Sequence, residues 1–190
     1  MITLGITGGI GCGKTTICKA LRLLDIPIFI SDIEAKKLMT FDPIVKNKLT
    51  SILGIEAYQE DGNLNKPYIS NKIFHNQEIL RKVNKVVHHA TKESFKHWKQ
   101  LQKNSIIAYE SALLFESGSD KLMDKVIFIQ APLKTRIERV MKRDKISKEQ
   151  VQARINNQMD EKKKEKRADY IINNHNQLII PQLLKLIDTI

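Results

Sequence analysis

One short run near the start of this 190-residue chain decides its fold: Gly8-Gly9-Ile10-Gly11-Cys12-Gly13-Lys14-Thr15-Thr16. Residues 8–15 fit the pattern G-x-x-x-x-G-K-[ST] of a phosphate-binding loop. An apolar, β-branched segment at 2–7 precedes the loop and predicts a buried strand, whereas 16–24 carries apolar residues at helical spacing. A strand, a glycine loop and a helix start in this order predict a site for a nucleoside triphosphate. A glycine-rich turn that binds nothing is the alternative, and the complete match disfavours it.

The residue types of the loop suit this chemistry. Glycines allow a positive φ and let the backbone approach an anion closely, so that several N–H groups converge on it. The helix that follows adds free N–H donors and the positive end of its dipole. Lys14 is expected to reach the β- and γ-phosphates, and the Thr15 hydroxyl to bind Mg²⁺. The residues expected to contact ATP are Gly9, Ile10, Gly11, Cys12, Gly13, Lys14, Thr15 and Thr16.

Composition favours one main α/β domain with a small insertion. No apolar run approaches the roughly 18 residues of a membrane span, and no basic region precedes the first apolar stretch as in a secretory signal. We therefore expect a cytoplasmic protein with no membrane association. The two cysteines, Cys12 and Cys18, are too few for a disulfide framework and have no metal-ligand companions nearby.

The formal net charge of +11 is concentrated in one segment. Residues 134–167 hold 13 Lys or Arg against 6 Asp or Glu. Such a concentration favours small polyanions, nucleotides above all, as ligands. Nucleic acid is the alternative, but aromatic residues make up only 6% of the chain and do not interleave with the basic segment, as they often do in RNA-binding modules.

Alternating strands and helices predict a parallel sheet with right-handed crossovers. Four further apolar runs are interpreted as strands, at 27–30, 105–110, 125–130 and 169–173. Between the second and third strands, 42–103 contains helical patterns and no convincing strand. This stretch is interpreted as a helical insertion, large enough to bind a second ligand. The charged segment 160–167 has the composition of a mobile loop.

Several charged residues stand at positions where ligands bind in such sheets. Asp32 follows the second strand, at the edge that faces the ligand, although an N-cap for the next helix is an equal alternative. Glu110 ends the third strand and resembles an acid that holds Mg²⁺. Arg136, Arg139 and Arg143 share one helix face and suit a phosphate clamp, with a solvated face as the alternative. His88 and His89 diverge by about 100° on a helix and cannot bind one metal together.

With these segments placed, the sequence resembles the dephospho-coenzyme A kinase family over nearly its whole length. The opening loop is common to many phosphate-binding proteins, but the other motifs are more specific. They are Ser31-Asp32-Ile33-Glu34-Ala35-Lys36, Gly62-Asn63-Leu64-Asn65-Lys66, Ile73-Phe74, 84–88, Leu113-Leu114-Phe115-Glu116, Arg139-Val140-Met141-Lys142-Arg143-Asp144, Arg154 with Gln158, and 168–174.

The resemblance implies a P-loop NTPase-type α/β fold, with a parallel five-stranded sheet flanked by helices. The nucleotide-binding core would comprise 1–41 and 104–190, with a helical lid at about 134–166. The insertion 42–103 would bind the acceptor. The implied reaction is transfer of phosphate from ATP to the 3′-hydroxyl of dephospho-CoA, which gives CoA and ADP in the last step of coenzyme A biosynthesis.

The resemblance also implies roles for single residues. Asp32 would take the proton from the attacking hydroxyl. Arg143 and Arg139 would neutralise the transferring phosphate, and Asn174 would lie near the adenine. The acceptor would be contacted by Asp32, Lys66, His88, Leu113 and Glu116. ATP and Mg²⁺ are the expected cofactors, and dephospho-CoA is the expected second substrate. The expected oligomeric state is a monomer or weak homo-oligomer, and no nucleic-acid partner is expected.

Four positions depart from the family pattern. Ile30 stands where an acid often precedes the catalytic Asp, and Lys66 replaces a usual Arg and so loses the bidentate fork. Ala112 and His89 each replace a proline. These departures affect local contacts of the acceptor and leave the phosphate-binding loop, Asp32 and the lid intact.

Overall fold

The computed structural model describes all 190 residues, which form two compact units. The first unit comprises Met1–Ile30 and Gln102–Ile190, and the second comprises Ser31–Leu101. None of the helices in the chain combines the length and the apolar character that a membrane span requires.

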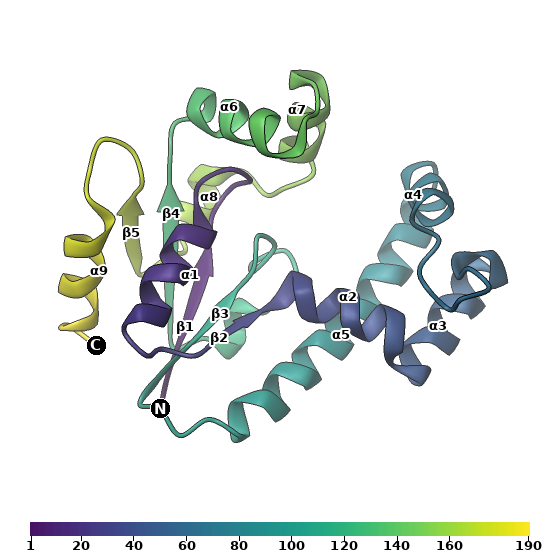
Figure 1. Cartoon of the computed structure of the whole chain (residues 1–190), viewed down its shortest axis with the longest axis horizontal. Coiled ribbons are helices and arrows are strands. Elements are labelled where there is room, and N and C mark those ends of the chain that lie inside the picture. The colour runs from purple at the N-terminus through teal and green to yellow at the C-terminus, as the bar shows by residue number, and fades with distance from the viewer. The chain divides into compact units, whose positions relative to one another are not determined.

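The first unit is built on a five-stranded parallel sheet (Figure 1). The strand order is β2-β3-β1-β4-β5, which confirms the predicted α/β class. The strands are apolar because both faces of a parallel sheet are covered, and β1 is buried from its second residue to its last. Their bounds are β1 (Ile2–Thr7), β2 (Ile28–Ile30), β3 (Ile106–Glu110), β4 (Lys125–Gln130) and β5 (Tyr170–Asn173).

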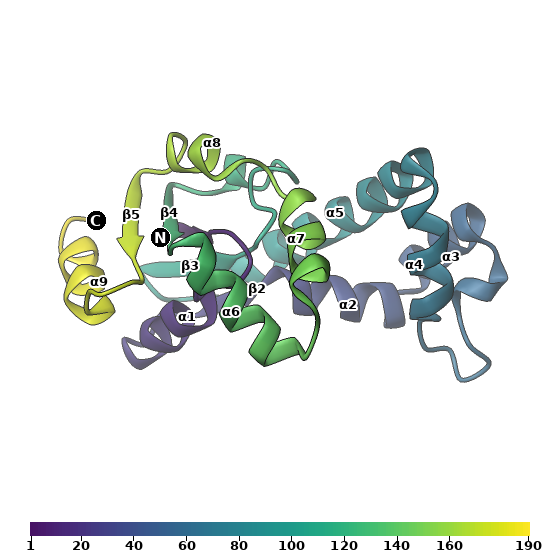
Figure 2. The ribbon, with the colours of Figure 1, turned by 90° about the horizontal axis from the view of Figure 1, so that it is seen from above.

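Helices cover both faces of this sheet. Figure 2 shows α1 and α9 on one face and α8 on the other. Ile17 and Leu21 of α1 and Leu183 of α9 are fully buried in one cluster with apolar residues of the strands. The helices of the unit are α1 (Lys14–Leu23), α6 (Leu133–Asp144), α7 (Lys148–Asn156), α8 (Glu161–Glu165) and α9 (Ile179–Ile187), with a short 3₁₀ turn at Asp120–Leu122.

The strand register places the loop residues at one edge of the sheet. Ile6 of β1 and Ile30 of β2 both lie opposite Glu110 of β3, so these three strands end together. The carboxyl edge of a parallel sheet is where ligands bind in folds of this kind. The phosphate-binding loop leaves β1 at this edge.

The second unit is entirely helical apart from one isolated β-bridge between Tyr58 and Leu64. Asp42, Asn65 and Asn76 each cap the start of a helix by accepting backbone N–H bonds. Its elements are α2 (Ser31–Phe41), α3 (Pro43–Leu53), a 3₁₀ turn (Ile55–Ala57), α4 (Lys66–Phe74) and α5 (Gln77–Gln100). Its core is formed by Val45, Leu49, Leu53, Ala57, Ile69 and Val83.

The division of the chain differs from the expected insertion at 42–103 by one helix. Helix α2 packs against α5 and α3 and therefore belongs to the helical unit. The Ser94 hydroxyl donates to the Glu34 carboxylate at 3.0 Å, and the Tyr58 hydroxyl donates to the Met39 carbonyl at 2.8 Å. These contacts bring residues distant in sequence together, which local sequence patterns do not reveal.

Candidate active site

The loop between β1 and α1 has the backbone geometry that an anion site needs. Gly11 and Gly13 have φ values of 81° and 99°, which side chains rarely allow. A Cβ atom at Gly13 would collide with the Asn174 carboxamide, so the position has no room for a side chain either. No side chain caps the start of α1. The Thr16 N–H donates to the Gly13 carbonyl at 2.9 Å, which leaves the N–H of Thr15 in the first turn of α1 available to a phosphate.

The side chains of the loop are arranged for a triphosphate. Lys14 Nζ donates to the Gly8 carbonyl at 3.0 Å, which uses one of its three protons and leaves two for a ligand. Thr15 and Thr16 are exposed, so their hydroxyls are accessible to a ligand. Cys12 is fully buried, and burial raises the pKa of its thiol. The thiol therefore stays neutral and serves as a packing group.

The three arginines of α6 have three different environments. Arg136 is only 3% exposed, and its guanidinium pairs with both carboxylate oxygens of Glu161, at 2.6 and 2.9 Å. Arg136 is therefore not a free cation, which differs from the prediction that all three arginines form a common phosphate clamp. The side chain of Arg143 is 61% exposed and pairs with Asp144. Its guanidinium is still accessible to a ligand.

Arg139 and Asn174 hold the second half of the loop. The Asn174 carboxamide donates to the Cys12 carbonyl at 2.7 Å. Arg139 donates to the Asn174 carbonyl at 3.2 Å and to the Gly11 carbonyl at 3.5 Å. Both residues predicted for the nucleotide site therefore lie against the loop, and the contact of Asn174 with adenine stays a prediction.

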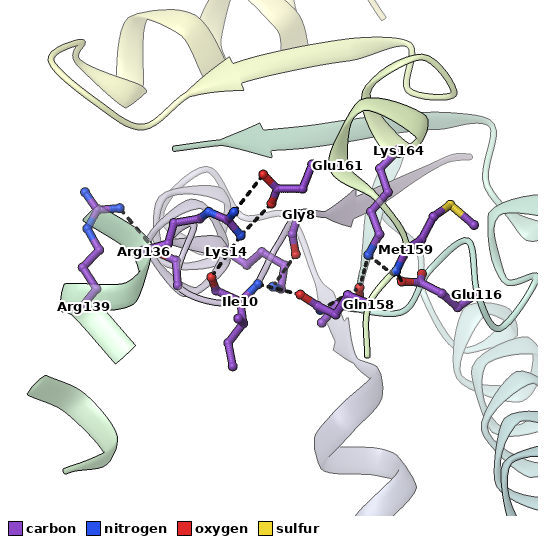
Figure 3. A network of polar contacts seen from close by, with 12 residues as sticks. Gly8, Ile10, Lys14, Glu116, Arg136, Arg139, Gln158, Met159, Glu161 and Lys164 are labelled. Atoms are coloured by element: carbon purple, nitrogen blue, oxygen red, sulfur yellow. Dashed lines mark hydrogen bonds and ion pairs between the residues drawn. The ribbon is translucent and has the colours of Figure 1, made fainter. Parts of the chain in front are cut away.

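Sequence reasoning missed a buried lysine, Lys164, which lies on α8 after α7 (Figure 3). Lys164 is fully buried and donates to the Glu116 carboxylate at 2.7 Å and to the Ala112 carbonyl at 2.9 Å. The Met159 N–H donates to the same Glu116 oxygen at 2.8 Å. The predicted mobile loop at 160–167 instead contains α8, because Asp160 caps this helix and Lys164 anchors it. Lys164 lies in a run of three lysines, so its sequence context gives no signal.

Replacing Lys164 with methionine is expected to destabilise the fold by about 3–5 kcal/mol, because Glu116, whose side chain is 20% exposed, would lose its cation and the Ala112 carbonyl would lose its donor. Denaturant unfolding followed by circular dichroism measures the change. Lys163→Met is the matched control, since Lys163 is the exposed neighbour in the same helix. Equal unfolding midpoints for the two variants would contradict the assignment.

The remaining predicted residues lie on different elements. Asp32 is the second residue of α2, is exposed, and makes neither an ion pair nor an N-cap hydrogen bond in the chain. Lys66 begins α4 and is exposed, whereas His88 is half-buried on α5. Leu113, in the loop after β3, donates its N–H to the Ser111 hydroxyl at 3.2 Å. Asp32, Lys66 and His88 therefore belong to the helical unit, and Leu113 belongs to the sheet unit with Glu116.

The site shows no dedicated metal cluster. No group of three or more His, Cys, Asp or Glu side chains is placed to hold a metal ion. Mg²⁺ in nucleotide sites is commonly held by one or two protein groups together with phosphates and water. The exposed Thr15 hydroxyl, with no competing protein partner, fits that role.

The strand, loop and helix order of this site, with a basic lid helix after β4, defines the class of P-loop kinases. The family model described as dephospho-CoA kinase matches residues 2–179. The chain belongs to the dephospho-CoA kinase family, which confirms the resemblance inferred from its motifs. It is an enzyme that phosphorylates dephospho-CoA with ATP in coenzyme A biosynthesis.

Individual relatives agree with this assignment. The dephospho-CoA kinase of Bacteroides fragilis (strain YCH46) is 38% identical over 98% of this chain and 91% of its own length. That of Porphyromonas gingivalis is 38% identical over 100% of this chain and 95% of its own length. The solved dephospho-CoA kinase from Campylobacter jejuni is 26% identical with a TM-score of 0.72, over 98% of this chain and 95% of that one. The fold is shared by shikimate kinase from Acinetobacter baumannii. That structure is 16% identical, has a TM-score of 0.57, and aligns over 100% of this chain and 92% of that one.

Proposed function

We propose that this enzyme transfers the γ-phosphoryl group of ATP to the 3′-hydroxyl of dephospho-CoA, with Asp32 as general base. The observation that carries the proposal is the phosphate-binding loop, where glycines of positive φ, the start of α1 and the Lys14 ammonium lie together. Phosphoryl transfer requires little covalent chemistry from the protein, so positioning and charge neutralisation supply most of the rate.

Asp32 is proposed as the base because its carboxylate is unoccupied. It follows β2 by two residues, on the side of the sheet where ligands bind in such folds. Its exposure and lack of partners leave both oxygens able to accept a proton from a substrate hydroxyl. An Asp used only to cap α2 would accept a backbone N–H bond, and Asp32 accepts none.

Charge neutralisation is assigned to Arg143 and Arg139, both exposed on α6. Arg136 is left out of this role because Glu161 already neutralises it. Mg²⁺, bound with ATP, would neutralise the β- and γ-phosphate oxygens. Thr15 is the proposed protein ligand of the metal.

Acceptor binding is assigned to the helical unit and to Leu113 and Glu116. The helical unit has a groove of about 760 Å³ with an apolar floor that includes Leu38, Val45 and Val86. Lys48 and Lys85 line this groove and pair with no carboxylate. An apolar groove with free cations suits a ligand such as dephospho-CoA, which carries an extended arm and a diphosphate.

A nucleic-acid partner is not part of the proposal. Three of the basic residues between 134 and 167 are engaged within the protein, as Arg136, Lys164 and Arg167 pair with Glu161, Glu116 and Asp120. One chain supplies residues for both substrates, which supports a monomer or weak homo-oligomer. A cytoplasmic location is proposed because the donor ATP is made and used there.

The proposal is tested by ADP formation from ATP with dephospho-CoA, shikimate or a nucleoside monophosphate as acceptor. The kcat/KM for dephospho-CoA is expected to exceed that for each other acceptor at least about 100-fold. We expect ³¹P NMR of the product to show the new phosphate on the 3′-hydroxyl. Chelation by EDTA is expected to stop the reaction, and added Mg²⁺ to restore it. Phosphate at another hydroxyl, or full activity in EDTA, would contradict the proposal.

A further inference from the structure

Both backbone groups of Ile10 are held by the lid (Figure 3). The Ile10 N–H donates to Gln158 Oε1 at 2.9 Å, and the Ile10 carbonyl accepts from Arg136 Nη1 at 3.4 Å. Arg136 lies on α6, near the start of the lid, and Gln158 lies between α7 and α8, in its second half. Two separate parts of the lid therefore bind the two peptide groups on either side of the Ile10 Cα in the phosphate-binding loop.

Ile10 occupies the centre of a tight turn. The Cys12 N–H donates to the Gly9 carbonyl at 3.1 Å, which makes Ile10 and Gly11 the two central residues. A positive φ at the second central residue, 81° at Gly11, is the feature of a type II turn. The N–H groups that follow this turn are those expected to bind phosphate, so its shape sets their direction.

Gln158 is fixed by its own neighbours. Its carboxamide Nε2 donates to the Ala112 carbonyl at 3.4 Å, and the next residue, Met159, donates its N–H to Glu116. Lys164 binds the same Ala112 carbonyl and the same Glu116 carboxylate. This frame leaves the carboxamide oxygen of Gln158 directed at Ile10.

We propose that Gln158 is a positioning residue that couples the lid to the phosphate-binding loop through the Ile10 N–H. It acts by holding the turn in the form that presents the following N–H groups to phosphate before ATP arrives. Such preorganisation reduces the entropy that the loop loses when a ligand binds to it. The loss of Gln158 should therefore weaken the binding of the nucleotide and leave the binding of the acceptor unchanged.

The first test is amide hydrogen exchange of the ¹⁵N-labelled protein without nucleotide, followed by NMR. Gln158→Leu removes both polar atoms at similar size, and the Ile10 N–H is expected to exchange about tenfold faster. The Ile6 N–H, in the centre of the sheet, is expected to stay unchanged as an internal reference. Gln152→Leu is the matched control, because Gln152 lies on α7 and bonds only to Asn156 in the same helix. Unchanged Ile10 exchange in Gln158→Leu would overturn the proposal.

The second test is kinetic and rests on the assigned kinase activity. Gln158→Leu is expected to raise KM for ATP about five- to tenfold while KM for dephospho-CoA and the melting temperature stay the same. Equal increases in both KM values, or a lowered melting temperature that accounts for the loss, would show a purely structural residue. The exchange measurement does not depend on catalysis, so a failure of the functional assignment is distinguishable from a failure of this inference.

Discussion

Asp32→Asn is expected to lower kcat by about 10²- to 10⁴-fold and to leave ATP affinity unchanged, because general base catalysis contributes a factor of that size. Asparagine keeps the shape of the side chain and removes its ability to accept a proton. Asp32 makes no bond within the protein, so the substitution costs no internal contact. Steady-state kinetics gives kcat, and calorimetric titration gives the ATP affinity.

The control for this variant is Asp61→Asn, since Asp61 is an exposed loop residue that contacts only Asn63. Normal turnover is expected there. Turnover within about threefold of the unmodified enzyme in Asp32→Asn would remove Asp32 as the base. Loss of ATP binding together with turnover would instead assign Asp32 to the donor site.

The sheet and the loop could be predicted because their signals are local. The run at 125–130 coincides with β4, because its four consecutive apolar residues, 126–129, are all buried between helices on the two faces of the sheet. The loop is recognisable because its glycines stand where positive φ is needed, as at Gly11 and Gly13. Each feature depends on residues adjacent in the chain.

The partners of charged side chains could not be predicted in this way. Helical spacing placed Arg136 on a face with Arg139 and Arg143, but its ion pair comes from Glu161, 25 residues further on. Lys164 is buried only because Glu116 and Ala112, about 50 residues earlier in the chain, meet it. The periodicity of the sequence shows which side chains share a face of a helix. Which residues pack against that face depends on the tertiary structure.

Glu116 shows how such a partner changes the interpretation of a motif. The residue was expected to contact the acceptor, and its Oε1 atom instead binds Lys164 and the Met159 N–H. Its Oε2 atom is buried without a protein partner. A contact of Oε2 with the acceptor stays a prediction, while the structural role of Oε1 follows from the contacts themselves.

Lys14→Ala is expected to lower kcat by about 10²- to 10³-fold and to weaken ATP binding at least about tenfold. The reason is that Lys14 brings the only side-chain cation of the loop, and removal of one such stabilising donor costs this much in comparable sites. Lys19→Ala is the matched control, because Lys19 is exposed on the same helix. Steady-state kinetics and calorimetric titration of ATP measure both effects.

The nucleotide series separates the two contributions of Lys14. Its Nζ also bonds the Gly8 carbonyl, so its loss removes a loop contact as well as a phosphate contact. If Lys14 reaches the β- and γ-phosphates, its removal weakens ATP and ADP binding and leaves AMP binding nearly unchanged. If the Gly8 contact alone mattered, the loop itself would change and all three nucleotides would lose affinity equally. Unchanged affinity and rate would overturn the assignment of the loop as the donor site.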